Sequence, residues 1–336
     1  MKLTDLTIKQ RLDIINNVSQ KTELSPVSIE KDWWVVQVLQ ALFSLPYSEH
    51  LSFKGGTSLS KCWHLINRFS EDVDIAIDRE FLGFDGTLSK TQVSDKLRRA
   101  SCSFVRERLQ NDLREQLTRI GINRDEFEVD VDITPITTTD PEVINVGYKS
   151  LFQSSGYITN AVKVEVSGRS MSEPIGPCSI RSIIDELYPN AEFAEHPVSL
   201  RAVTAERTFL EKLFLIHEEL VKPTGQVRVS RMSRHIYDLA MMSNAGIGDN
   251  ALSNESLYRR VIEHRRKFIG LKDFNYDELY PSTLRVVPVG SIAEKWREDY
   301  EAMREEMIFG NAPTYEELID TVTALNEQVA NLPYKP

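Results

Sequence analysis

Hydrophobic residues recur along this chain with two different periods, one typical of helices and one typical of strands. Apolar positions three or four residues apart, together with end signals, predict helices over residues 4–18, 27–42, 59–67, 89–120, 204–220, 231–243, 291–307 and 315–330. Short apolar or strictly alternating runs predict strands over residues 51–53, 73–77, 127–133, 162–167 and 199–202. Because every predicted strand precedes residue 203, we expect an α+β fold with a core domain over residues 1–202 and a helical domain over residues 203–336.

Signals inside and between the elements refine this prediction. Ser25-Pro26 favours a helix start, since serine caps a helix and proline suits its first position. The helix that follows carries Glu30-Lys31-Asp32 beside two tryptophans, which we interpret as a surface turn next to a core contact. The remaining signals predict an interruption of the long helix near Ser101 and loops over residues 82–87 and 134–141.

Length and charge narrow the class of protein. A chain of 336 residues can bury a sizeable core and form two domains. The net charge of −10 argues against broad, nonspecific coating of nucleic acid, which requires a basic surface. A local basic groove stays open, because arginines gather in two helical regions, residues 98–119 and 228–267. Such clusters are equally typical of solvated helix faces.

Three further features bear on location. The longest apolar run, residues 33–43, is interrupted by two glutamines and is too short to span a membrane. The first residues lack the apolar core of a secretion signal. Cys62, Cys102 and Cys178 show no paired spacing, which fits a reducing compartment and argues against a zinc site. We therefore expect a cytoplasmic protein with no membrane partner.

The strongest chemical signal is the segment KGGTSLSK (residues 54–61) followed by SEDVDIAI (residues 70–77). Together they predict a strand, a glycine turn, a helix and a second strand. Because residues two apart in a strand share a face, Asp72 and Asp74 are expected to project together. Helix amides attract phosphate and carboxylate oxygens suit Mg²⁺, so this unit could hold a metal-bound polyphosphate. The alternative is a hairpin-like unit with a polar outer face.

Other acidic and basic residues are candidates with plain alternatives. Glu165 alternates with buried valines and is a candidate third carboxylate, or part of an ordinary Lys–Glu strand surface. A second Asp-x-Asp, Asp130 and Asp132, lacks a preceding glycine turn and is interpreted as the exposed face of its strand. Lys212 and Asp238 lie on helices. By themselves they suggest an exposed lysine paired with Glu219 or Thr208, and an intrahelical pair of Asp238 with Arg234.

Seven segments in this order resemble the AbiEii/AbiGii-type nucleotidyltransferase toxins of the DNA polymerase β-like nucleotidyltransferase superfamily. These segments are EKDWWVVQVL, KGGTSLSK, RFSEDVDIAI, KVEVSGR, AERTFLEKLFLIHEE, SRHIYDLAMM and WREDYEAMREEMI. The resemblance implies a mixed sheet flanked by helices, with the helical domain completing the active-site cleft. It also implies Mg²⁺-dependent transfer of a nucleoside monophosphate from an NTP, with Mn²⁺ as an alternative metal. For some members the acceptor is the 3′ end of tRNA, and members act beside a cognate antitoxin in type IV toxin–antitoxin or phage-defence pairs.

The resemblance also assigns roles to single residues. It places the metal ligands at Asp72, Asp74 and Glu165, where Glu165 stands in for the superfamily's usual aspartate. It makes Lys212 a cation facing the triphosphate and Asp238 a catalytic aspartate. The residues assigned to NTP binding are Gly55, Gly56, Thr57, Ser58, Lys61, Ser70 and Lys212. Two other functions stay open: a small-molecule nucleotidyltransferase of the antibiotic-modifying type, and an inactive core that binds a protein partner.

Overall fold

The computed structural model describes residues 1–132, 141–153 and 159–336, and in it the chain divides into two compact units. Unit 1 comprises residues 1–62 and 69–203, and unit 2 comprises residues 63–68 and 204–336. The short segment 63–68 therefore belongs to the second unit although the chain on both sides of it belongs to the first. The division into domains 1–202 and 203–336 stays a prediction, and most of the predicted loop 134–141 lies outside the described residues.

Unit 1 is built on a seven-stranded mixed sheet with the strand order β3-β4-β5-β2-β1-β7-β6. The strands β2 and β5 run parallel, as do β1 and β7, and the other neighbours are antiparallel. The strand bounds are β1 Leu51–Lys54, β2 Val73–Ile77, β3 Phe127–Val131, β4 Glu142–Tyr148, β5 Ala161–Ser167, β6 Ile175–Ile180 and β7 Val198–Val203. The mixed sheet is confirmed.

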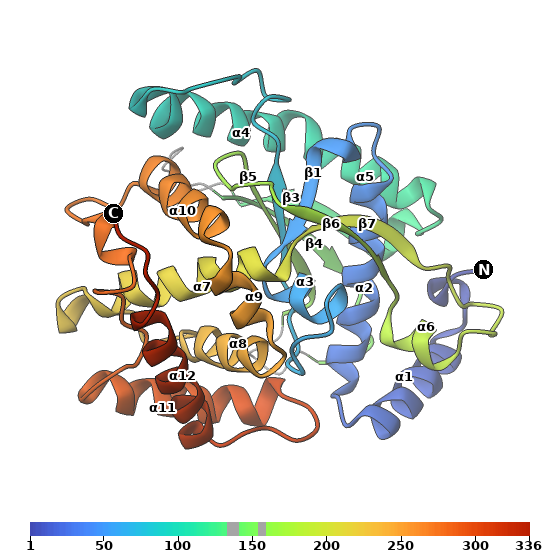
Figure 1. Ribbon diagram of the computed structural model, residues 1–336. Helices are drawn as coiled ribbons and strands as arrows, with labels where there is room; N and C mark the ends of the chain where they lie inside the picture. Colours follow the sequence, from blue (N-terminus) through green and yellow to red (C-terminus); the bar gives the residue numbers. More distant parts are fainter. Residues whose placement is uncertain (133–140, 154–158) are drawn as a thin grey trace. The chain divides into compact units, whose positions relative to one another are not determined.

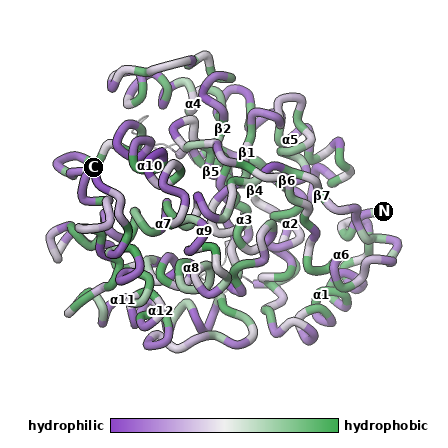
Figure 2. The backbone as a smooth tube through the Cα atoms, viewed as in Figure 1, coloured by the Kyte–Doolittle hydropathy of each residue, from purple (hydrophilic) through white to green (hydrophobic). Residues whose placement is uncertain are grey.

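Helices flank this sheet (Figure 1), and their bounds are α1 Ile8–Thr22, α2 Pro26–Phe43, α3 Gly55–Lys61, α4 Arg98–Phe104, α5 Gln110–Arg119 and α6 Ile183–Leu187. The predicted start of α2 is confirmed, since Ser25 accepts a hydrogen bond from the Ser28 amide and Pro26 is the first helical residue. Helix α2 packs against β5 and β7, and Trp34 stacks on Tyr148 of β4 with ring centroids 5.0 Å apart. The hydropathy colouring shows hydrophobic residues concentrated along the strands and along α2 (Figure 2).

In unit 1, some predicted elements have the wrong extent, and two strands of the structure were not predicted. The helix predicted over residues 59–67 begins at Gly55 and ends at Lys61. No break occurs at Ser101, because the helical segment continues through it with π-helical turns at Gln92–Leu97 and Val105–Leu109. The strands β4 and β6 were not predicted. Each contains residues that disfavour strands, glycine and asparagine in β4 and glycine and proline in the edge strand β6.

Unit 2 is helical in the residues that the structure describes. Its helices are α7 Ala205–Leu220, α8 Ser233–Asn244, α9 Ile247–Ser253, α10 Glu255–His264, α11 Ser291–Met307 and α12 Tyr315–Ala330. Helix α8 is central, because it packs against α7, α9, α11 and α12. The bounds of α11 and α12 agree with the prediction at both ends. Within the described ranges of the chain, none of the helices combines the length and apolar character needed to cross a membrane.

Candidate active site

The glycine turn lies directly against the strand that carries the first Asp-x-Asp. Strands β1 and β2 pair so that Lys54 stands opposite Asp74. Gly55 follows with a φ of +79°, and a Cβ atom built on it would overlap the Asp74 carboxylate. Glycine is therefore required here twice, once by the backbone conformation and once by the closeness of the acid. The turn and Asp74 form one local structure, as the sequence spacing predicts.

The candidate third carboxylate lies on the neighbouring strand. In the parallel pair of β2 and β5, Asp74 and Glu165 are register partners, and both are half-buried. Register partners on adjacent strands present their side chains on the same face of a sheet. Glu165 is thus beside Asp74 and is not turned into the interior, where its neighbours Val164 and Val166 are fully buried. The second Asp-x-Asp differs: Asp130 is exposed on β3, as predicted.

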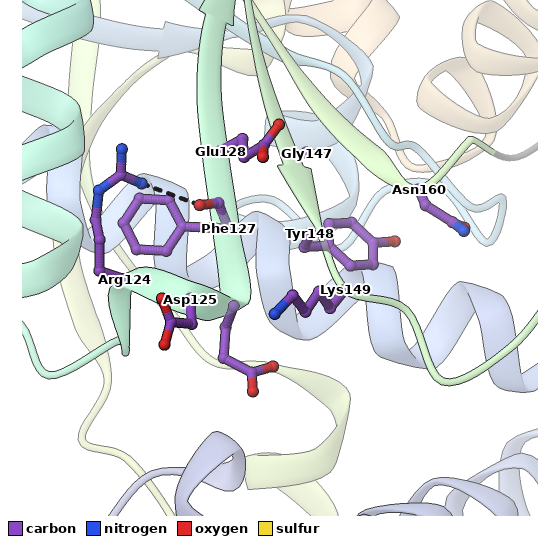
Figure 3. Close-up of a pocket in the computed structure, with 9 residues that line it drawn as sticks. Arg124, Asp125, Phe127, Glu128, Gly147, Tyr148, Lys149 and Asn160 are labelled. Atoms are coloured by element: carbon purple, nitrogen blue, oxygen red, sulfur yellow. Dashed lines mark hydrogen bonds between the residues drawn. The ribbon is translucent and has the colours of Figure 1, made fainter.

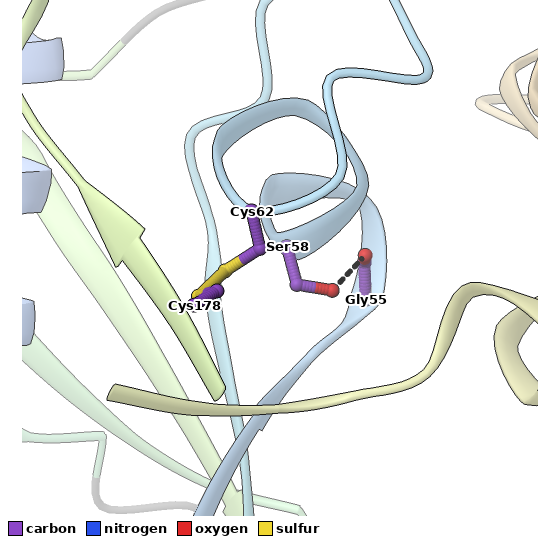
Figure 4. The surroundings of a disulfide bond; sticks show 4 residues. All are labelled: Gly55, Ser58, Cys62 and Cys178. Carbon is purple, nitrogen blue, oxygen red and sulfur yellow. Dashed lines mark hydrogen bonds between the residues drawn. A yellow bond between two sulfur atoms is a disulfide. The ribbon is translucent and has the colours of Figure 1, made fainter. Parts of the chain in front are cut away.

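The hydroxyl groups of the turn are engaged inside the protein. Thr57 donates a hydrogen bond of 2.5 Å to the backbone carbonyl of Asp72, and its Oγ1 lies 2.9 Å from the Ser70 Oγ. Ser58 donates to the Gly55 carbonyl at 2.9 Å (Figure 4). Both Thr57 and Ser58 are buried. These contacts fix the start of α3 against the start of β2, so the hydroxyls hold the shape of the turn.

Lys61 ends α3 and has partners of its own. It forms an ion pair with Asp32 of α2 and donates a hydrogen bond of 3.2 Å to the Arg181 carbonyl. Only 11% of its side chain is exposed. The next residue, Cys62, is joined to Cys178 of β6 by a disulfide, with Cα atoms 5.5 Å apart (Figure 4). The interpretation of the cysteines as unpaired is therefore wrong for these two. They are 116 residues apart in the sequence, and the fold brings the end of α3 next to β6.

The donor set around Asp74 suits a divalent cation in its chemistry. Carboxylate oxygens are the hard ligands that Mg²⁺ prefers, and Asp74 and Glu165 supply two carboxylates from adjacent strands. Because Gly55 has no side chain, the Asp74 carboxylate can lie where a Cβ atom would otherwise stand. Among the described residues, no group of three or more acidic, histidine or cysteine side chains gathers as a ready-made metal site. Two of the three predicted ligands are thus brought together, and the third, Asp72, lies one residue before β2.

In unit 2, Asp238 joins two cations that are distant in sequence. Its carboxylate accepts hydrogen bonds from Arg68 Nε at 2.7 Å and Nη2 at 2.8 Å, and pairs with Lys212 Nζ at 2.9 Å. All three residues are buried. The alternative readings are wrong: Asp238 does not take Arg234 as its ion-pair partner, and Lys212 is neither exposed nor paired with Glu219. Glu219 instead binds Lys222 and Arg228.

Burial and charge set the protonation states of this cluster. Burial raises the pKa of Asp238, but the charges and hydrogen bonds of Arg68 and Lys212 outweigh that effect and lower it below its ordinary value. Burial is also the main cause that lowers the pKa of Lys212, partly offset by Asp238. The Nδ1 of His235 lies 3.5 Å from Lys212 Nζ, and burial lowers the pKa of His235 well below its ordinary value. At neutral pH Asp238 is therefore ionised and His235 is neutral.

A cavity of about 560 Å³ lies elsewhere in unit 1, at the start of β3 and the end of β4 (Figure 3). Its lining mixes charges of both signs, and Arg124 there donates a hydrogen bond to the Phe127 carbonyl. The lining residues are Arg124, Asp125, Glu126, Phe127, Glu128, Gly147, Tyr148, Lys149 and Asn160. None of the predicted site residues is among them, so this cavity is not the candidate active site.

The mixed sheet, the glycine turn against the Asp-x-Asp strand and the further acid on the adjacent parallel strand are what the resemblance to nucleotidyltransferases implies. The comparison with family models agrees: residues 37–324 match the model described as "Nucleotidyl transferase AbiEii toxin, Type IV TA system". The chain belongs to this AbiEii family of toxin nucleotidyltransferases and is a nucleotidyltransferase. The family implies an NTP substrate and a cognate antitoxin.

A solved structure shows the same fold. The chain is similar to MenT4, a nucleotidyltransferase toxin from Mycobacterium tuberculosis H37Rv, with 17% identity, a TM-score of 0.56 and coverage of 97% of this chain and 90% of that one. It is also similar to JHP933 from Helicobacter pylori, with 13% identity, a TM-score of 0.44 and coverage of 91% and 93%. No curated protein matches the chain.

Sequence reasoning missed the residues that hold the predicted ones in place. Arg68 carries no signal in the sequence, although it stands four residues before Asp72. The sequence favours a surface turn at Glu30, Lys31 and Asp32, whereas all three residues are buried. A usable signal was present in the second case. Three consecutive charges inside the most apolar predicted helix are unusual unless each has a buried partner.

Proposed function

We propose that this chain is a Mg²⁺-dependent nucleotidyltransferase toxin that transfers a nucleoside monophosphate from an NTP to the 3′ end of tRNA. It would act in the cytoplasm as the toxin of a type IV toxin–antitoxin or abortive-infection pair. The observation that carries this proposal is the placement of Asp74 beside Glu165 and against Gly55. The family membership supports the reaction class, and the tRNA acceptor, the metal and the location are our proposals.

The roles follow from the chemistry of each side chain. Asp72, Asp74 and Glu165 would hold the divalent cation, with Mn²⁺ as the alternative ion. When bound, such a cation neutralises charge on the phosphates and lowers the pKa of the acceptor hydroxyl. Glu165, with one more methylene group than aspartate, can also accept the proton of that hydroxyl.

The remaining residues would bind and orient the nucleotide. The residues proposed for the NTP are Gly55, Gly56, Thr57, Ser58, Lys61, Ser70 and Lys212. Lys212 would neutralise charge on the departing pyrophosphate, as cationic side chains do in phosphoryl transfer. Its ion pair with Asp238 supports this role by holding the ammonium in one place. We assign Asp238 to that positioning, since it is completely buried and already bonded to two cations.

The charge distribution favours contact with a short part of an RNA molecule and not with an extended stretch of it. Many arginines of the two clusters are engaged with acids of the protein itself: Arg98 and Arg99 with Asp95, Arg106 with Glu142, Arg108 with Asp112, Arg119 with Glu115, Arg228 with Glu219, Arg259 with Glu255, and Arg265 with Glu218. With a net charge of −10, a wide electrostatic footprint on RNA is not expected. An RNA acceptor that is bound only at its 3′ end is consistent with this acidic net charge and these paired arginines.

The test is transfer of label from each α-labelled NTP to total RNA and to small hydroxylated acceptors, with Mg²⁺ and with a chelator. We expect label in tRNA. We also expect Asp74→Ala to lower the rate of transfer roughly 10³-fold or more, because without this carboxylate the cation that neutralises charge in the transition state is no longer held. The matched control is Asp130→Ala, which removes an aspartate of the exposed second Asp-x-Asp and should leave the rate unchanged. Label only in small acceptors would favour the antibiotic-modifying type of enzyme. Toxicity that survives Asp74→Ala would favour a binding module.

A further inference from the structure

Helix α2 carries three consecutive charged residues in the core of unit 1. Glu30, Lys31 and Asp32 have relative exposures of 5%, 1% and 3%. Successive residues of an α-helix point about 100° apart, so the three side chains leave the helix in three directions. Charged groups are placed in protein interiors only when they are paired there. The partners therefore show what this segment does.

Lys31 connects the beginnings of the two strands that carry the candidate acids. Its ammonium pairs with Glu71 at 2.6 Å and donates to the Thr159 carbonyl at 2.9 Å. Glu71 immediately precedes Asp72, and Thr159 stands two residues before β5, the strand of Glu165. One buried cation is thus bonded to the entry of β2 and to the entry of β5. These are the parallel neighbours in which Asp74 and Glu165 are register partners.

The two residues beside Lys31 hold other segments of the same unit. Asp32 forms an ion pair with Lys61 at the end of α3 and accepts a hydrogen bond of 2.7 Å from the Ile183 amide. Glu30 accepts hydrogen bonds from the Ser150 hydroxyl and, at 3.0 Å, from the Leu151 amide, in the segment after β4. The glycine-turn helix α3 and the entries of β2 and β5 are therefore all bonded to one turn of α2.

We propose that Lys31 is a positioning residue of the active site, which fixes β2 relative to β5 through Glu71 and the Thr159 carbonyl and so holds Asp74 beside Glu165. This inference deepens the proposed function and rests on it. Stability alone does not explain the pair, because a buried ion pair is often replaced by apolar residues at little or no cost in stability. What the pair provides is a fixed placement of two strands whose acids must act together.

The test replaces both charges at once, so that no unpaired charge is left buried. In Lys31→Met/Glu71→Leu, we expect a melting temperature close to that of the wild type. We also expect kcat to fall roughly 10²-fold, since a displacement of about 1 Å at a reacting centre has that effect. The apparent KM for NTP should change much less. Mn²⁺ binding, measured by electron paramagnetic resonance without substrate, should weaken roughly ten-fold, which is about 1.4 kcal/mol.

A matched control and a milder variant keep the result interpretable. Lys2→Met/Glu195→Gln removes another largely buried ion pair of unit 1, one not bonded to β2 or β5, and should leave kcat and Mn²⁺ binding unchanged. Glu71→Gln keeps a hydrogen bond to Lys31 and removes the charge; it should weaken Mn²⁺ binding less than the double variant does. Unchanged Mn²⁺ binding and kcat in the double variant would overturn the inference. The inference would also be overturned if kcat and Mn²⁺ binding fell only because the double variant has a lowered melting temperature.

The two proposals fail in different ways. If the wild type transferred no nucleotide to any acceptor, the proposed function would be wrong, while Mn²⁺ binding would still decide whether Lys31 positions the acids. If the wild type were active and the double variant equally active, only the inference about Lys31 would be wrong.

Discussion

Asp238 shows how burial changes the role of a single residue. A carboxylate that is completely buried between Arg68 and Lys212 is held ionised by its neighbours and is a poor proton acceptor. Its main effect is to keep two cations in fixed positions. The sequence placed Asp238 on a helix face with Arg234, but the partner that the structure shows, Arg68, is 170 residues away.

Replacing this carboxylate should therefore destabilise the protein. We expect Asp238→Asn to lower the free energy of unfolding by roughly 3 to 5 kcal/mol, because two buried cations lose their counterion. Since the pKa of Asp238 is lowered in the folded state, its contribution is present at neutral pH and is lost as the pH falls below about 4. Urea unfolding of both proteins between pH 7 and pH 3 measures this difference.

The control for that experiment is Asp249→Asn, which changes an exposed aspartate of unit 2 bonded to the Gln328 amide. It should stay within about 0.5 kcal/mol of the wild type at every pH. If Asp238→Asn were as stable as this control at pH 7, the assignment of Asp238 as an anchor would be wrong.

His217 gives unit 2 a second dependence on pH. Its side chain is buried, and its Nδ1 accepts a hydrogen bond of 2.9 Å from the Arg285 amide. Burial lowers the pKa of His217 to about 4. In the unfolded chain this histidine has a pKa of about 6.5, so as the pH falls it binds a proton before the folded protein does. The free energy of unfolding therefore decreases as the pH falls from about 6.5 towards 4.

We expect this single histidine to account for about 3 kcal/mol of that loss. His217→Gln, which can still accept from the Arg285 amide, should flatten the stability curve between pH 6.5 and pH 4. His64→Gln changes a histidine that is exposed and serves as the control. Curves of equal slope for the wild type and His217→Gln would contradict the neutral assignment of His217.

At the scale of elements, the junction of β1, α3 and β2 depends on one glycine. Gly55→Ala should abolish most transfer activity, because the new methyl group would displace the Asp74 carboxylate. The strained backbone alone should reduce stability by roughly 1 to 2 kcal/mol. Gly83→Ala separates the two effects, since Gly83 has a similar φ of +84° and no atoms near its missing Cβ. It should lose comparable stability and keep full activity, as a labelled-NTP assay and thermal unfolding would show.

At the same scale, the elements that the sequence predicted well are those whose ends are set by residues close by in the chain. The ends of α11 and α12 and the Ser25-Pro26 start of α2 follow from periodicity and capping within a few residues. Strands β4 and β6 were missed because their partners, and not their own composition, make them strands. The charged turn of α2 was misjudged for a related reason, since Lys31 finds Glu71 only after the sheet has formed.

At the scale of the whole molecule, two units share one interleaved chain. Residues 63–68 belong to the helical unit, so the chain leaves unit 1 after α3 and returns just before β2. Arg68 thereby reaches Asp238 within unit 2, while Ser70 and Asp72 belong to unit 1. A boundary placed after the last predicted strand, at residue 203, takes no account of this excursion, because a six-residue segment carries no signal of its own.

Local sequence patterns specify the class of fold, the glycine turn before Asp72 and Asp74, and the alternation that turns Glu165 away from its buried valine neighbours, since each depends on residues a few positions apart. The folded structure makes Asp74 and Glu165 register partners, joins Asp238 to Arg68 and brings Cys62 to Cys178, and no local pattern predicts these contacts. The physical reason is the same in each case. Strand pairing and buried ion pairs are fixed by which surfaces meet when the core closes, and no local pattern of residues records that choice.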